Sequence, residues 1–254
     1  MSTWAIAPEV MPWFLAAVGL IAGTIDAIAG GGGLITVPAL MLAVGPGADA
    51  IGTNKIAGVC AAFSAMLVYR QKQPMNWRVV IEFAISVAVG SFAGSQVSPL
   101  LPPQAFRWFL VLSGPVILAI VWNRNLWVGI SRREGLNPKP VRIVIAGIAC
   151  GFYDGVWGPG GGTFMLLSLL FFGDLPLIAG LVTSKFANTV SASSALIGYA
   201  WKGHVHWFLG LSLGAGACIG AWIGARFASE RTAQVVRPAL ALVVALLLVR
   251  VLTS

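Results

Sequence analysis

The feature that most constrains this chain is a series of apolar stretches, each about as long as a membrane crossing. Examples are residues 11–29, 79–97 and 238–252, and a helix needs roughly 17–25 apolar residues to cross a bilayer. Charged residues make up only 9% of the 254 positions, against about 25% in soluble domains. The chain therefore has too little polar surface to face water, and we predict an all-α, polytopic membrane protein.

The two halves of the chain share a sequence pattern. Asp26 is followed by glycines at 30–33, and Asp154, 128 positions later, is followed by glycines at 158 and 160–162. Lys55 matches Lys185 at an offset of 130. The same offset relates the pairs Ser64/Ser194, Tyr69/Tyr199, Trp77/Trp207, Gly90/Gly220 and Gly94/Gly224. Internal duplication of this kind is typical of membrane transporters.

Each half divides into five apolar segments. The first half gives 11–29, 33–44, 51–70, 77–98 and 105–122, and the second gives 141–157, 162–173, 179–200, 207–227 and 233–252. The second segment of each half has about a dozen residues, roughly 18 Å of helix, which is too short for a full crossing. We expect these segments to be half-helices broken by glycine, in repeats at 1–122 and 141–254 joined by a basic linker at 123–140.

Basic residues are distributed unevenly between the predicted loops. If each half crosses the membrane an odd number of times, the loops with eleven of the basic residues lie on one side. The loops with three of them lie on the other side. The positive-inside rule puts the basic linker in the cytoplasm and both termini outside the cytoplasmic (inner) membrane. Two halves with odd crossings have opposite orientations, which predicts an inverted repeat.

The glycine runs interrupt apolar segments at matching places. Gly30, Gly31, Gly32 and Gly33 form the first run, and Gly158, Gly160 and Gly161 belong to the second. A break of this kind frees backbone N–H groups, which lipid cannot satisfy. It could be a packing break that lets helices approach closely. Alternatively, the N–H groups at the start of a half-helix could bind an anion.

Each half has one lysine near the start of its third segment. Lys55 follows Thr53-Asn54, and Lys185 follows Thr183-Ser184. Ionisable residues at membrane depth are costly and point to function, although both lysines could instead extend to the membrane surface. The hydroxyl and amide groups before them could bind the same anion or cap the helices. Asn188 and Ser191 extend this polar face only in the second half, where the first half has Gly58 and Ala61.

Asp26 and Asp154 precede the glycine runs by four residues. Each could neutralise a lysine as a structural ion pair. Each could also take up a proton for coupling, since burial disfavours the charged carboxylate.

Other polar and aromatic residues carry less information. His204 and His206 are expected at the surface, because two histidines are too few ligands for a metal site. Tyr69, Tyr199, Trp77 and Trp207 lie at segment ends and are expected in the interfacial aromatic belt. No cofactor is expected. The net charge of +8 is explained by loop topology, so no nucleic-acid partner is expected.

The motifs resemble those of the sulfite exporter TauE/SafE family over nearly the whole chain. The resemblance rests on Gly30-Gly-Gly-Gly-Leu-Ile-Thr-Val-Pro-Ala-Leu40, on Gly151-Phe-Tyr-Asp-Gly155 with Gly158-Pro-Gly160, and on the two lysine motifs. It implies a permease for sulfur-containing anions such as sulfite, sulfoacetate or other organosulfonates.

We therefore expect a secondary transporter of a small sulfur-containing anion, coupled to an ion gradient, with its site between the halves. An anion channel or a transporter of a different small organic anion is the alternative. A membrane enzyme would need a nucleophile–base pair or metal ligands at membrane depth, and no such pattern is present in the sequence. Assembly as a homodimer is left open.

Overall fold

The computed structural model describes residues 7, 9–29, 31–71, 76–122, 140–173 and 175–228, and these contain helices without a strand. The helices are α1 (Met11–Ala29), α2 (Gly33–Val44), α3 (Ala48–Tyr69), α4 (Trp77–Val97), the short 3₁₀ helix η1 (Ser98–Leu100), α5 (Pro103–Trp122), α7 (Pro140–Val156), α8 (Gly161–Phe172), α9 (Leu177–Trp201) and α10 (Trp207–Phe227). These bounds confirm the all-α prediction and agree with nine of the ten predicted segments to within about three residues. The tenth segment, 233–252, lies outside the described residues.

The two short segments are short helices. α2 and α8 have 12 residues each, which is roughly 18 Å of helix and less than the hydrocarbon core of a bilayer. Among the described residues, four stretches are long and apolar enough to cross a membrane: Met11–Ile28, Ala48–Tyr69, Trp77–Leu100 and Trp207–Phe227. Large apolar side chains such as Ile85, Ile145 and Phe208 are more than half exposed, as lipid-facing residues of a multi-pass membrane protein are.

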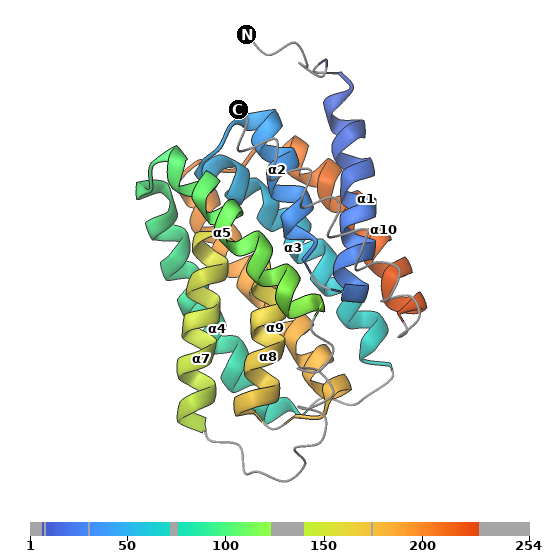
Figure 1. Cartoon of the computed structure of the whole chain (residues 1–254), viewed down its shortest axis with the longest axis vertical. Helices are drawn as coiled ribbons and strands as arrows, with labels where there is room; N and C mark the ends of the chain where they lie inside the picture. Colours follow the sequence, from blue (N-terminus) through green and yellow to red (C-terminus); the bar gives the residue numbers. More distant parts are fainter. Residues whose placement is uncertain are drawn as a thin grey trace.

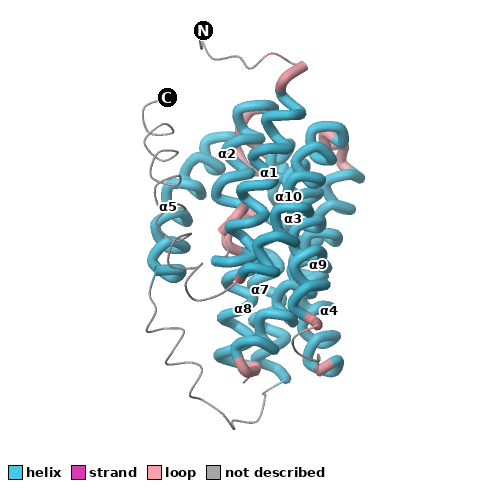
Figure 2. Tube along the Cα trace, turned by 90° about the vertical axis from the view of Figure 1, so that its right-hand side faces the viewer, coloured by secondary structure: helices cyan, strands magenta, loops and turns pink. Residues whose placement is uncertain are grey.

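α3 and α9 lie at the centre of the bundle and contact each other. The helices lie side by side along the long axis of the molecule (Figure 2). Their contacts occur in matching pairs: α1 packs on α10 as α7 packs on α4, α3 packs on α10 as α9 packs on α4, and α2 packs on α3 as α8 packs on α9. This pairing is the pattern that two equivalent halves would produce.

Glycines set the closest helix contacts, and the repeated glycines make equivalent contacts. A Cβ on Gly90 would lie 2.2 Å from the carbonyl oxygen of Ile148, and one on Gly220 would lie 2.0 Å from that of Leu20. Ile148 and Leu20 are themselves 128 positions apart, the spacing of the two aspartates. Small residues allow such backbone contact between membrane helices. The α4–α7 and α1–α10 pairs are therefore packed in the same way, with a glycine of one helix against the backbone of the other.

The first helices of the two halves run in opposite directions. Figure 1 shows α1 starting at the upper end of the molecule and α7 starting at the lower end, each leading towards the middle. The opposite membrane orientation of the halves stays a prediction, as do the repeat boundaries. Most of the predicted basic linker, residues 123–139, lies outside the described residues.

Candidate functional site at the two helix breaks

The two glycine runs break the chain between α1 and α2 and between α7 and α8. Gly31 has a φ of 87° and Gly158 a φ of 102°, values that residues with a Cβ rarely adopt. The breaks meet each other, because a Cβ on Gly33 would lie 2.9 Å from the Cα of Pro159. Both runs therefore belong to one region of the molecule. Gly30 lies outside the described residues.

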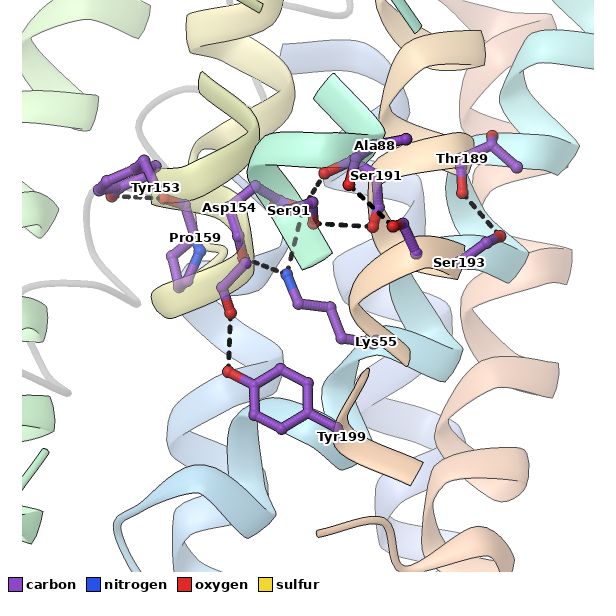
Figure 3. Close-up of polar contacts among 12 residues, drawn as sticks. Lys55, Ala88, Ser91, Tyr153, Asp154, Pro159, Thr189, Ser191, Ser193 and Tyr199 are labelled. Carbon is purple, nitrogen blue, oxygen red and sulfur yellow. Dashed lines mark hydrogen bonds and ion pairs between the residues drawn. The ribbon is translucent and has the colours of Figure 1, made fainter. Parts of the chain in front are cut away.

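Lys55 on α3 forms an ion pair with Asp154 at the end of α7. Its Nζ lies 3.1 Å from Asp154 Oδ2, and the side chains are 3% and 6% exposed. The same ammonium donates to the backbone carbonyl of Asp154. Ser191 on α9 donates a hydrogen bond of 2.6 Å to Asp154 Oδ2, and Ser91 on α4 donates to the carbonyl of Ser191 at 2.8 Å. Figure 3 shows Lys55 and Ser191 converging on Asp154.

Lys185 on α9 makes the converse pair with Asp26 on α1. Its Nζ lies 2.7 Å from Asp26 Oδ2, and the side chains are 7% and 22% exposed. It also donates to the carbonyl of Asp26 at 3.2 Å. The backbone N–H of Gly32 donates to Asp26 Oδ1 at 3.1 Å. Each lysine is therefore neutralised by the aspartate of the opposite half, so the predicted ion pairing is present and it crosses between the halves.

The glycines leave room for these carboxylates at the start of the short helices. A Cβ on Gly161 would lie 2.5 Å from Asp154 Oδ1, and one on Gly32 would lie 2.7 Å from Asp26 Cβ. The positive end of a helix dipole stabilises a nearby carboxylate. The N-terminal ends of α2 and α8, which we expected to bind an anion, thus already lie beside resident carboxylates.

Asn188 lies beside this region. Its Nδ2 is 3.2 Å from the place a Cβ on Gly162 would occupy, in the first turn of α8. Asn54 is buried, and its Oδ1 has no hydrogen-bond partner among the described residues.

Of the three hydroxyl residues expected to bind the anion, Thr53, Thr183 and Ser184, two have hydrogen-bond partners of their own in the structure. Thr53 Oγ1 accepts a hydrogen bond of 3.0 Å from the backbone N–H of His206, and Ser184 Oγ donates to the carbonyl of Leu181 in its own helix. Thr183 is buried. Their alternative reading as helix caps is wrong, because α3 begins at Ala48 and α9 at Leu177, at least one turn earlier.

The prediction that Tyr69 and Tyr199 lie in an interfacial belt is also wrong. They are 3% and 0% exposed. Tyr199 donates to the carbonyl of Gly155 at 2.7 Å, and Tyr69 donates to the carbonyl of Ala27. These carbonyls follow the two aspartates by one residue, so the tyrosines fix the ends of α7 and α1. Trp77 and Trp207 are more than half exposed, as belt residues would be.

Three further contacts were not foreseen. Ser91 donates a hydrogen bond to the backbone carbonyl of Ser191, and no motif in the sequence distinguishes Ser91 from other serines. Trp157, directly after α7, donates through Nε1 to Ser113 on α5 at 3.0 Å, so α5 is fastened to the second break. Asp49 at the start of α3 lies 2.6 Å from Nδ1 of His204.

Comparison with known proteins finds one family model and several relatives that are similar to this chain. Residues 15–251 match the family model described as "Sulfite exporter TauE/SafE". A probable membrane transporter protein of a Sinorhizobium species is 31% identical over 242 residues, which cover 95% of this chain and 92% of the relative. One from Haemophilus influenzae is 32% identical over 227 residues, covering 87% and 86%. The probable membrane transporter protein YfcA of Escherichia coli K12 is 28% identical over 244 residues, covering 92% and 87%. No solved structure matches the chain.

Proposed function

Because this chain belongs to the sulfite exporter TauE/SafE family, we propose that it is a secondary transporter of a small sulfur-containing anion. Sulfite, sulfoacetate and other organosulfonates are the candidate substrates. The relatives with 31% and 32% identity are named as probable membrane transporters, which supports transport rather than catalysis. The membrane would be the cytoplasmic one, with the basic linker inside and both termini outside.

The observation that carries the proposal is the pair of crossed ion pairs at two helix breaks that touch each other. Charged residues at membrane depth are costly and mark ion or substrate pathways. Four of them meet here, with Lys55 and Lys185 as the cations that could bind an anion. Backbone N–H groups of the glycine runs and the Asn188 amide are the neutral donors that could complete the site.

The crossing of the pairs suggests how transport is coupled to an ion gradient. Each lysine is already bound to a carboxylate, so an incoming anion competes with that carboxylate for the ammonium. Protonation of the aspartate would remove the competitor, and the anion and the proton would then bind together. A transporter with such a site moves the anion and the proton in the same direction, and the pH gradient drives this transport.

A thermal-shift screen on the purified full-length protein tests the substrate class. A ligand that binds the native state raises the apparent melting temperature, by an amount that grows with concentration. We expect a rise with sulfite or an organosulfonate and none with acetate, which carries a carboxylate in place of the sulfur oxyanion. An equal rise with acetate would favour a transporter of a different small organic anion, and no rise with any sulfur anion would contradict the proposal.

A further inference from the structure

The two ion pairs differ in how firmly the carboxylate is held. Asp154 receives the Lys55 ammonium and the Ser191 hydroxyl on the same oxygen, and its side chain is 6% exposed. Asp26 receives the Lys185 ammonium and one backbone N–H, and its side chain is 22% exposed. The first carboxylate is closed off from solvent, whereas the second is more than three times as accessible.

The sequence explains this difference through two hydroxyl groups. Ser191 binds Asp154 and is itself held by Ser91, so α4, α7 and α9 are linked around that carboxylate (Figure 3). At the matching positions of the opposite half, offset by 130, stand Ala61 and Ala221. The hydroxyl chain around Asp154 therefore has no equivalent around Asp26.

The two halves also differ in a polar side chain three residues after the lysine. Asn188 follows Lys185 by three residues, so it lies on the same face of α9, and its amide is next to Gly162 at the start of α8. The matching residue after Lys55 is Gly58, which has no side chain. α9 thus carries a neutral donor in the turn that follows Lys185, beside the start of α8, whereas α3 has no side chain at the matching position.

We propose that the Asp26–Lys185 pair is the one that opens to exchange a proton and an anion, and that the Asp154–Lys55 pair stays closed and holds the two halves together. This assignment rests on the proposed function and gives its two lysines different roles. In the step itself, Asp26 takes up one proton and releases Lys185, and a monovalent anion takes the place of the carboxylate. One positive and one negative charge enter together, so the net charge of the site does not change.

Among the described residues, few other groups around Asp26 could take the proton. The hydroxyl of Tyr69 on α3 donates to the carbonyl of Ala27, the residue after Asp26. α2 has no charged residue, and α1 has none besides Asp26 itself. On α10, Cys218 and Arg226 are the titratable residues. Lys185 is therefore the charged partner whose release follows from protonation of Asp26.

Carbodiimide labelling tests the assignment without relying on transport. Dicyclohexylcarbodiimide reacts with protonated carboxyl groups in apolar surroundings, and mass spectrometry locates the adduct in the full-length protein in detergent. We expect Asp26 to be labelled faster as pH falls and Asp154 to remain largely unlabelled. Ser191→Ala should raise the labelling of Asp154 severalfold, because it removes the hydroxyl donor. Equal or faster labelling of Asp154 in the wild type, or labelling of Asp26 that does not depend on pH, would overturn the proposal.

Proteoliposomes provide the functional arm, with sulfite as the probe. Asp26→Asn should lose accumulation driven by a pH gradient and still exchange internal for external sulfite, since an amide cannot titrate. Glu82→Gln is the matched control, because Glu82 pairs with Arg78 at an exposed place on α4. If Asp26→Asn accumulates sulfite as the wild type does, the assignment is wrong. If the wild type moves no sulfite, the proposed substrate is wrong, and the labelling still decides which aspartate exchanges protons.

Discussion

The Lys55 ammonium lies 3.1 Å from the Asp154 carboxylate, and both side chains are almost completely buried. α3 of the first half thereby holds the end of α7 in the second. The converse pair of Lys185 and Asp26 holds the end of α1. Neither break aspartate is paired with the lysine of its own half, so each helix break depends on the other half for its electrostatic balance.

Removing the charge of Asp154 should destabilise the protein strongly. Asp154→Asn would leave the Lys55 ammonium buried without its counter-ion, which typically costs about 3–5 kcal/mol. The double variant Lys55→Met/Asp154→Asn should recover part of that loss, since no buried charge is then left unpaired. Unfolding of the detergent-solubilised variants measures both effects. A single variant as stable as the wild type would contradict the role of this pair in holding the halves together.

Removing the charge of Lys185 should abolish anion binding. In Lys185→Ala, the thermal shift produced by sulfite should disappear. Lys185→Arg should not restore the full shift, because a planar guanidinium does not match the contacts of a compact ammonium. Lys202→Ala is the control, because this exposed lysine at the end of α9 binds only the carbonyl of Gln96 among the contacts of the described residues. An unchanged sulfite shift in Lys185→Ala would remove Lys185 from the binding site.

A methyl group at the second helix break should disturb the aspartate. In Gly161→Ala the new Cβ would lie 2.5 Å from Asp154 Oδ1, and overpacking of this kind costs about 1–3 kcal/mol. Gly58→Ala is the matched control, since its Cβ would meet Ala192 Cβ at 3.4 Å, an ordinary contact, within a helix that favours alanine over glycine. Melting temperatures of the two variants should therefore differ clearly, with Gly161→Ala lower. Equal values would show that the carboxylate has more freedom than the structure indicates.

The membrane orientation can be checked with a reporter that is active only in the cytoplasm. The excess of Lys and Arg in the linker predicts activity when the reporter is inserted near Gly135 and silence when it is fused after Ser254. Both positions lie outside the described residues, so this prediction stands on the sequence alone. Activity at both positions would contradict halves with opposite orientations.

The sequence predicts the helices well and the site only in part. Apolar length and the glycine runs locate the described helices and mark α2 and α8 as half-helices, because both signals are local. The repeat also singles out Lys55, Lys185, Asp26 and Asp154. It does not say which lysine meets which aspartate, since the offsets are the same whether the pairs form within a half or between halves.

Thr53 illustrates why a neighbour in sequence can be absent from the site. The predicted segment starts at 51, which would leave Thr53 in the first turn beside the end of the helix. α3 starts at Ala48 instead. With 3.6 residues per turn, two positions inside a helix differ by about 200° in direction. Thr53 therefore faces α10, where its methyl group lies 3.2 Å from the place a Cβ on Gly210 would occupy, and away from Lys55.

The most direct test of the account is the flux of sulfite into proteoliposomes that contain the purified wild-type protein. We predict saturable uptake that accumulates sulfite above its external concentration when the outside is acidic, and that falls to simple equilibration when a protonophore removes the pH gradient. Flux that does not saturate and is the same with and without the gradient would indicate a channel, and the absence of sulfite movement would contradict the proposed substrate.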